Sequence, residues 1–547
     1  MREAKRTVGV PKASRVPSGL IPIVVAAAVG ALLAAVDLGT RSLWLDEGST
    51  FAIVSQHGAA LWRGIAHDGG NMLLYYLVMH VLVAWFGDAT WVMRLPSVIA
   101  NGLTGALVAA LALRLFAGNR RLATAAGLLA VVSLPLVFWG QNVRGYAWLV
   151  TLSVGSFLAL LAILQTPGER PPSRRAICAY VLTTLAALYI GYDVALLLPA
   201  QLALLALYRE RARLVIACLA LVALLSVPLL VLAAQRGSGQ LFWVTPLGWP
   251  IAGRATLALF SAAFVPNFHR TSTTAPTVIL MGLAVLTGLV LATRTVIQAA
   301  RRREHRREHA APLLLILSWT LVPTVLTVAV YAAGEPIELS RVTILELPAL
   351  ALLVAWALLR AEVRPALGAA AVAVLLALRL LQVIPNYGVS PEPWNTVTAY
   401  VLHATPASRP ACVAFYPQDG REAVDYYLKA SPQGLRLDTN GPSSGPARGA
   451  DPAPSLRPML PSLPWGAIRP YVERYGTLDP TQQARIAGEC PRLWLIASHE
   501  GQAHGTHQSL ANLRRYHRLE RELRTRYQHS SLRSFGWASP IKVRLYW

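Results

Sequence analysis

The amino-acid sequence predicts a mainly α-helical, polytopic membrane protein with about 11 transmembrane helices, juxtamembrane helices and a C-terminal α/β domain. Hydrophobic residues make up 54% of the 547 residues and charged residues 14%, whereas soluble domains carry about 25% charged residues. Apolar runs of near-span length recur until about residue 385, and basic clusters separate alternate runs. This composition excludes a disordered chain, collagen, a disulfide-rich miniprotein and an ordinary soluble enzyme.

The first apolar run, about 20–36, follows a short basic segment that contains Arg2, Lys5, Arg6, Lys12 and Arg15. A signal peptide has a similar pattern, but further apolar runs follow and no clear cleavage site ends this one. We therefore expect a first span with a cytoplasmic N-terminus. The net charge of +23 is interpreted in the same way, as membrane topology rather than a nucleic-acid site.

Ten later runs approach the length of a span: 92–116, 122–140, 146–165, 176–191, 193–208, 214–235, 277–298, 312–333, 342–360 and 366–384. The loops that carry arginine clusters are 114–121, 169–175, 209–213, 301–307 and 360–364. Every second loop is basic, so the positive-inside rule places the others, around 141–145, 236–276 and 332–341, outside. The run 72–86 is too short to span and would break this alternation. We expect it to be a juxtamembrane or half-buried helix on the outer side.

The composition changes after about residue 386, where Gly, Pro and polar residues increase. We predict a transmembrane domain over 1–385 and a soluble extracytoplasmic α/β domain over 386–547. Strands are expected at 411–416, 493–497 and 541–546, an amphipathic helix over 510–527 and a Gly/Pro/Ser-rich loop over 440–454. Cys412 and Cys490 are disulfide candidates, because the outer side of the membrane is oxidising.

Two acidic clusters lie where outer loops are expected. Asp46 and Glu47 follow the first span, beside apolar anchors such as Trp44. Carboxylates at a membrane surface are costly unless they have a function, and one of them could be a general base for an acceptor hydroxyl. The alternative is a cap on a helix N-terminus. Asp68, in the second cluster, could assist Asp46 or bind a sugar hydroxyl, or it could cap a turn.

Three arginines are expected on the same outer face: Arg94, Arg144 and Arg341. Arginine binds phosphate oxygens with a planar, two-pronged group. For each arginine alone the alternative is snorkelling at the interface. Three of them on the side that is poor in positive charge, together with the acids, favour a lipid-phosphate substrate.

At these residues the chain resembles the GT-C superfamily of membrane glycosyltransferases. It is more similar to the bacterial branch related to protein O-mannosyltransferases and to the lipid A aminoarabinose transferase (glycosyltransferase family 39-like). The resemblance rests first on Asp46-Glu47, on Asp68 and on the stretch from Asn71 to Tyr76, which includes Tyr75. Further along it rests on Arg94-Leu95-Pro96-Ser97, on Gln141, Arg144 and Tyr146, and on the late Arg341. The family has a His or Lys and two prolines where this chain has Asn71-Met72-Leu73, which leaves the exact donor open.

The resemblance implies that a sugar on a polyprenyl monophosphate is transferred with inversion to an acceptor hydroxyl on the extracytoplasmic face of a bacterial inner membrane. Asp46 would be the base, with Glu47 and Asp68 as further catalytic candidates. Arg94, Gln141, Arg144, Tyr146 and Arg341 would bind the donor phosphate, and Trp44, Asn71, Tyr75 and Tyr76 the substrate. Many relatives with monophosphate donors need no metal, although Asp46, Glu47 and Asp68 could hold one divalent ion.

Other functions remain open at this point. A flippase for a lipid-linked sugar predicts polar groups near the bilayer midplane, and a ligase or polymerase with a diphosphate donor shares most of the chemistry. A scaffold without catalysis would tolerate loss of Asp46. Mannose and arabinofuranose are both plausible sugars, and the acceptor is a glycan, a lipid or a protein. Trp394, Trp465, Trp494 and Trp537 are candidate surfaces for stacking on an acceptor glycan, although such tryptophans are more often core or interface residues.

Overall fold

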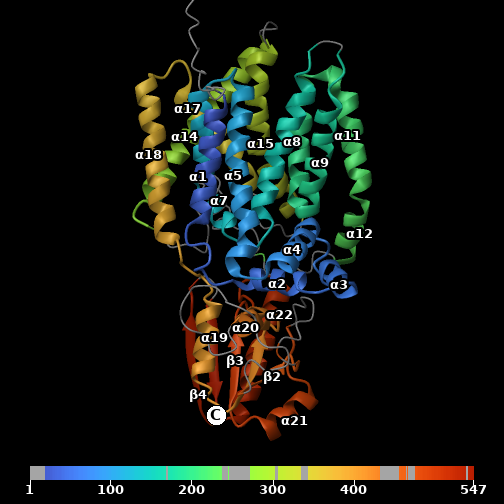
Figure 1. Ribbon diagram of the computed structural model, residues 1–547, viewed down its shortest axis with the longest axis vertical. Coiled ribbons are helices and arrows are strands. Elements are labelled where there is room, and N and C mark those ends of the chain that lie inside the picture. The colour runs from blue at the N-terminus through green and yellow to red at the C-terminus, as the bar shows by residue number, and fades with distance from the viewer. Residues whose placement is uncertain are drawn as a thin grey trace, which may run out of the picture.

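The computed structural model describes residues 19–167, 170–236, 244, 271–301, 306–333, 343–430, 455–463, 465, 475–537 and 540–547. A bundle of long helices stands end to end with a smaller α/β part that contains the C-terminus (Figure 1). The predicted class, a mainly helical membrane protein with a C-terminal α/β part, is confirmed. The basic segment 1–18, the loop 440–454 and Arg341 lie outside the described residues.

The first half of the bundle contains α1 Leu20–Ala35, α5 Thr90–Leu115, α6 Arg120–Val131, α7 Leu134–Gly140, α8 Tyr146–Leu164, α9 Arg174–Ile190, α10 Leu198–Ala203, α11 Ala212–Leu225 and α12 Val227–Arg236. The second half contains α14 Thr274–Arg301, α15 Arg306–Ala332, α17 Leu347–Leu359 and α18 Pro365–Val383. The short 3-10 turns at Tyr192–Leu197, Leu204–Ala206, Arg209–Arg211, Thr343–Glu346 and Ile384–Asn386 connect or extend these helices.

Within the described residues, five helices are long and apolar enough to cross a membrane, or seven if each of two bent pairs counts as one span. The pair α6 and α7 bends by 64°, because Pro135 in the first turn of α7 has no N–H for a continuous helix. Other predicted spans fall on shorter apolar helices, namely Leu20–Ala35, Tyr192–Ala206 and Thr343–Leu359. The chain is a multi-pass membrane protein.

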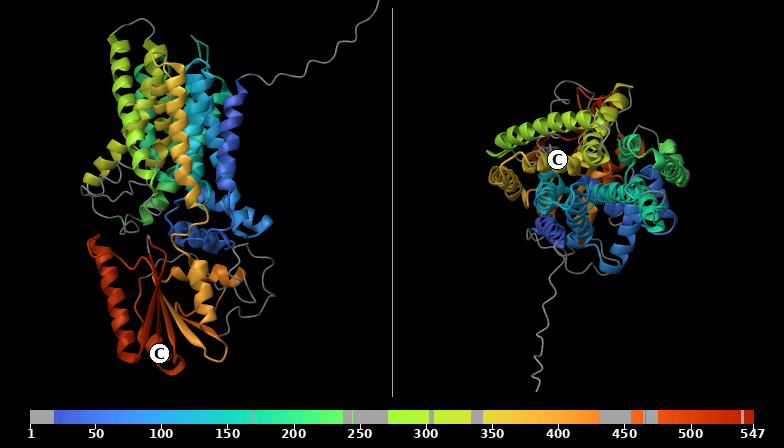
Figure 2. Two further views of the ribbon diagram at one scale, coloured as in Figure 1. Left: turned by 90° about the vertical axis from the view of Figure 1, so that its left-hand side faces the viewer. Right: turned by 90° about the horizontal axis from the view of Figure 1, so that it is seen from above.

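Three short helices lie between the bundle and the α/β part: α2 Leu45–Val54, α3 Ala59–His67 and α4 Leu73–Phe86 (Figures 1 and 2). The predicted short helix over 72–86 is α4, at this end of the bundle. Its apolar end exposes Trp85 and Phe86, which is typical of aromatic side chains at a membrane–water interface.

The α/β part contains α19 Trp394–His403, β1 Ala411–Tyr416, α20 Gly420–Ala430, β2 Leu456–Leu460, α21 Pro480–Glu489, β3 Leu493–Ala497, α22 His507–Arg526, β4 Ser530–Phe535 and β5 Ile541–Tyr546. The sheet order is β2-β1-β3-β5-β4. β1 pairs in parallel with β2 and β3, and β5 is antiparallel to β3 and β4. The carboxyl end of β5 is remote from the bundle (Figure 1). The carboxyl ends of β1 and β3 therefore lie at the sheet edge that faces the bundle.

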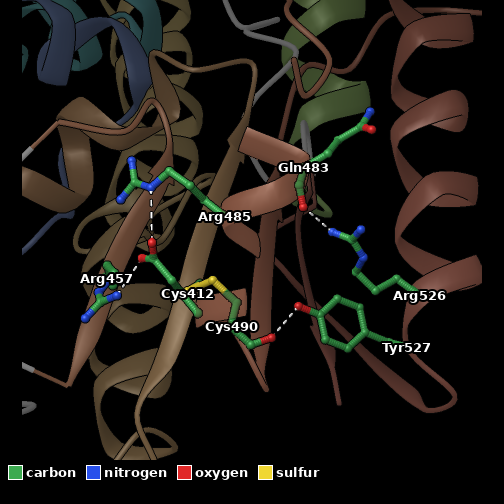
Figure 3. The surroundings of a disulfide bond; sticks show 8 residues. Cys412, Arg457, Gln483, Arg485, Cys490, Arg526 and Tyr527 are labelled. Carbon is green, nitrogen blue, oxygen red and sulfur yellow. Dashed lines mark hydrogen bonds and ion pairs between the residues drawn. A yellow bond between two sulfur atoms is a disulfide. The ribbon is translucent and has the colours of Figure 1, made fainter. Parts of the chain in front are cut away.

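Cys412 and Cys490 form a disulfide with a Cα–Cα distance of 5.5 Å (Figure 3). The bond joins β1 to the residue after α21. Beside it, the Tyr527 hydroxyl donates to the Cys490 carbonyl at 2.7 Å. These contacts connect the end of α22 to the same corner of the sheet.

Two of the four tryptophans considered for sugar stacking are in the core, as the alternative for them expected. Trp394 and Trp494 are no more than 1% exposed. Their indole N–H groups donate to Glu392 at 3.3 Å and to Thr405 Oγ1 at 2.9 Å. A buried indole that has found a polar partner is a packing residue.

Candidate active site

The first turn of α2 carries Asp46 and Glu47. The Glu47 carboxylate accepts the Trp44 N–H through Oε2 at 3.3 Å, which caps the helix. It also accepts the Val143 N–H through Oε1 at 2.8 Å and a two-pronged ion pair from Arg94, at 3.0 and 2.8 Å. Glu47 is fully buried. The cap alternative therefore describes Glu47.

Every N–H group of Arg94 has a partner. Besides its two bonds to Glu47, Arg94 donates to the carbonyls of Leu38 at 2.9 Å, Arg41 at 3.0 Å and Ser42 at 3.2 Å. A guanidinium has five donors, and all five are used. The pair Glu47–Arg94 thus fastens α2, α5 and the loop after α1 to one another. This geometry favours a positioning role for both residues over the catalytic and phosphate-binding roles expected from the sequence.

Asp46 belongs to a second, more open group that comes from four elements. The Asp46 side chain is 27% exposed, and its Oδ2 lies 3.7 Å from Arg144 Nη2. Arg144 Nη1 lies 3.3 Å from both Thr50 Oγ1 and the Tyr76 hydroxyl. Tyr76 in turn donates to Asp68 Oδ2 at 2.8 Å. Four of the residues selected from the sequence, Asp46, Asp68, Tyr76 and Arg144, therefore meet at one place.

The electrostatics of this group distinguish Asp68 from an ordinary surface acid. Burial raises the pKa of Asp68 to about 6, although Arg144 and the Tyr76 hydroxyl oppose the shift and Asp46 adds to it. The Asp68 carboxyl group therefore exchanges its proton close to neutral pH.

The loop between α7 and α8 is held by its own polar side chains. Gln141 accepts from Arg41 Nη2 at 3.1 Å and donates to the Val36 carbonyl at 2.5 Å. The Tyr146 ring packs on Trp139 at 4.1 Å between centroids, and the Arg144 guanidinium lies 6.0 Å from the Tyr146 ring centroid. Gln141 and Tyr146 thus position Arg144.

Of the three remaining substrate candidates, two lie against the loop that carries Arg144. The Trp44 indole donates to Asn142 Oδ1 at 2.6 Å. Tyr75 is buried, and a Cβ added at Gly145 would lie 3.4 Å from its Cβ. Asn71 donates its backbone N–H to the Asp68 carbonyl at 3.2 Å. Trp44 and Tyr75 support the Arg144 loop, and Asn71 lies at the Asp68 turn.

Two residues of this region were missed from the sequence. Arg41 is buried, and burial together with Arg94 lowers its pKa to about 10. Its position in a loop on the side poor in positive charge could have indicated it. Glu392 accepts the Leu45 N–H at 3.1 Å. It comes from a segment remote in the sequence, and no local pattern indicates this contact.

The three carboxylates considered for a divalent ion, Asp46, Glu47 and Asp68, do not form one site. Glu47 is ion-paired with Arg94, whereas Asp46 lies beside Arg144. In the part of the chain that the structure describes, no group of three or more His, Cys, Asp and Glu side chains is placed to hold a metal ion.

No protein-family model matches the sequence, and no curated protein matches it. The solved structure of ArnT from Cupriavidus metallidurans in the apo state is similar over 95% of this chain and 97% of that chain, with 14% identity and a TM-score of 0.51. ArnT bound to undecaprenyl phosphate is similar over 97% and 98%, with 13% identity and a TM-score of 0.47. The oligosaccharyltransferase AglB from Archaeoglobus fulgidus, in complex with an inhibitory peptide and a dolichol-phosphate, is similar over 88% and 69%, with 14% identity and a TM-score of 0.47. The likeness to apo ArnT extends over almost the whole of both chains, and the chain therefore has the GT-C fold that the sequence resemblance implied.

Proposed function

We propose that the chain is a membrane glycosyltransferase that moves a sugar from a polyprenyl-phosphate donor to an acceptor hydroxyl. The observation that carries the proposal is the pair Asp46–Arg144. A partly exposed carboxylate lies 3.7 Å from a buried guanidinium, where the helical bundle meets the α/β part. A base and a phosphate-binding cation are thus within reach of the two ends of one reacting group.

In the proposed reaction, Asp46 accepts the proton of the acceptor hydroxyl as its oxygen attacks the anomeric carbon. The bond between that carbon and the phosphate oxygen breaks on the opposite face, so the configuration inverts. The electron pair of the broken bond leaves with the polyprenyl phosphate. Arg144 stabilises this developing charge, and a contact of this kind is worth about 10²- to 10³-fold in rate. The transition state has oxocarbenium character, as in glycoside hydrolysis.

Asp68 and Tyr76 have a different role in this scheme. Tyr76 lies between Asp68 and Arg144, with polar contacts of 2.8 and 3.3 Å. We propose that Asp68 binds a hydroxyl of the donor sugar. Tyr76 would hold the side chains of Asp68 and Arg144 in place. Arg341, which lies outside the described residues, remains a proposed second phosphate contact.

The donor class follows from the phosphate-binding cation and agrees with what is known of a protein of this fold, since ArnT has been solved bound to undecaprenyl phosphate. A mannosyl or arabinosyl donor and a glycan, lipid or protein acceptor fit the proposal. We place the N-terminus in the cytoplasm of a bacterium and the α/β part, residues 386–547, outside the inner membrane. The disulfide between Cys412 and Cys490 supports an oxidising compartment for that part.

The rival function is a flippase, because two charged residues are buried inside the bundle. Glu346 accepts from Thr324 Oγ1 at 2.7 Å. Arg379 donates to the Leu129 carbonyl near the end of α6, where the bend to α7 interrupts the helix. The Arg379 contact is what a helix end inside a bundle requires, so this residue gives the flippase little support.

The test is turnover of polyprenyl-phosphate sugars by the purified protein in nanodiscs, with a mixed acceptor pool. We expect the wild type to release polyprenyl phosphate from at least one donor, and Asp46→Asn to lose about 10³-fold or more. Asp37→Asn is the matched control, because Asp37 is exposed in the loop that precedes α2 and its left-handed backbone also suits Asn. Movement of intact donor across liposomes by both variants, without release of phosphate, would support the flippase instead.

A further inference from the structure

Glu392, in the α/β part, contacts α2, the helix that carries the proposed base Asp46 and is called the catalytic helix below. It precedes α19 and is 3% exposed. Its Oε2 accepts the Leu45 N–H at 3.1 Å and the Trp394 indole N–H at 3.3 Å. Leu45 is the first residue of α2 and the neighbour of Asp46, so Glu392 holds the turn that carries the proposed base.

His499 fixes Glu392 from the edge of the sheet. It follows β3, and its Nε2 lies 3.4 Å from Glu392 Oε1. Its Nδ1 lies 2.9 Å from Ser498 Oγ. The backbone of His499 is left-handed, with φ of 53°, a conformation that costs free energy for a residue other than glycine and that collects at functional sites. The carboxyl edge of a parallel sheet is also where α/β proteins place their ligand sites.

The first turn of α2 is therefore held from two sides. Glu47 accepts the Trp44 N–H from within the helix, and Glu392 accepts the next N–H, that of Leu45, from the α/β part. Gly48 brings α2 against α20, since a Cβ added there would lie 3.1 Å from the Ala423 nitrogen. Burial raises the pKa of Glu392, and the nearby His499 opposes that shift. The helix N-terminus stabilises the carboxylates gathered there.

We propose that Glu392 and His499 are positioning residues for the transfer reaction. Glu392 fixes the Leu45 N–H and with it the Asp46 carboxylate, and His499 keeps Glu392 in that position. The α/β part thus completes the catalytic helix besides offering a surface to the acceptor. This inference rests on the proposed function, and it names residues that no local sequence pattern indicates.

The kinetic test compares Glu392→Ala with Glu392→Gln, using the polyprenyl-phosphate sugar that the wild type turns over. We expect kcat of the Ala variant to fall about 10- to 100-fold, with the donor KM within about threefold, because a buried N–H loses its charged partner. The Gln variant keeps an oxygen for the Leu45 N–H and stays within about fivefold of the wild type. His499→Ala loses roughly three- to tenfold, since one stabilising contact of Glu392 disappears.

Matched controls separate positioning from general damage to the α/β part. Glu489→Gln removes a carboxylate from the exposed pair with Arg457, and His504→Ala removes an exposed histidine of the same loop. Both are expected to keep wild-type kcat. A Glu392→Ala variant with wild-type kcat would overturn the proposal. So would equal losses in the Ala and Gln variants together with a lowered thermal midpoint, because that pattern indicates a structural role only.

Hydrogen exchange tests the same contact without any turnover. In the wild type and in Glu489→Gln, the amides of residues 45–49 should exchange slowly. In Glu392→Ala the Leu45 amide should exchange about tenfold faster or more. If no donor turns over, the proposed function fails and this measurement still decides the contact. Unchanged exchange in Glu392→Ala would refute the positioning role even in an active enzyme.

Discussion

Replacing Arg94 with lysine separates the two roles that the sequence and the structure give to this residue. The guanidinium makes two bonds to Glu47 and three to backbone carbonyls of the loop after α1. A lysine ammonium has three donors on one atom and cannot reach both sets. The lysine keeps the positive charge beside the buried Glu47 but leaves at least two of the five acceptors without a donor from this residue, which at about 1–3 kcal/mol each amounts to about 3–5 kcal/mol. At about 2 °C per kcal/mol for a large domain, the thermal midpoint should fall by about 6–10 °C.

The assay is thermal unfolding of the purified protein in detergent, followed by turnover at a temperature where the variant is folded. The matched control is Arg114→Lys on the same helix, because Arg114 is exposed and donates to Gln165. We expect this control to unfold like the wild type. Arg94→Lys with a wild-type midpoint and no turnover would refute the reasoning and return Arg94 to the donor phosphate.

Three further predictions follow from the site and from the α/β part. Arg144→Lys should lower kcat about 10²- to 10³-fold, because a single ammonium nitrogen cannot replace both Nη1, beside Thr50 and Tyr76, and Nη2, beside Asp46, while it contacts a phosphate; an unchanged kcat in steady-state turnover would exclude Arg144 from the leaving group. Because the pKa of Asp68 is raised to about 6, its ionised fraction increases as the pH rises through 6, and turnover should increase with it. That dependence should disappear in Asp68→Asn, and a pH profile equal to that of the wild type would contradict it. Loss of the Cys412–Cys490 disulfide in a double serine variant should lower the free energy of unfolding by about 2–5 kcal/mol, measured in denaturant against Cys178→Ser, which removes a free exposed thiol.

Composition and charge were sufficient to predict the fold class, because the apolar runs and the alternation of basic loops are properties of the chain itself. They do not indicate where a span bends. A run such as 122–140 appears continuous in sequence, but Pro135 divides it into α6 and α7 with a 64° bend. Two tryptophans that appeared available for sugar were core residues, since hydropathy does not distinguish a buried indole from an exposed one.

Part of the candidate site could likewise be predicted from the sequence, and part could not. The sequence indicated Asp46, Asp68 and Arg144 because the expected topology places their loops on one side of the bundle, and it indicated Tyr76 through the family resemblance. The sequence could not predict that Arg94 donates all five of its hydrogen bonds to Glu47 and three backbone carbonyls, since this depends on how the loops fold over one another. Glu392 was unpredictable for a similar reason, because its contact with Leu45 joins parts of the chain 347 residues apart.

The most direct test of the central claim is the ratio of turnover between Asp46→Asn and Asp37→Asn, measured as release of polyprenyl phosphate under one condition. The two variants make the same chemical change, in α2 and in the loop that precedes it, and Asp46 is the one that lies beside Arg144. Asp37→Asn should keep wild-type turnover, while turnover by Asp46→Asn should fall about 10³-fold or more. Equal turnover in the two variants would contradict it.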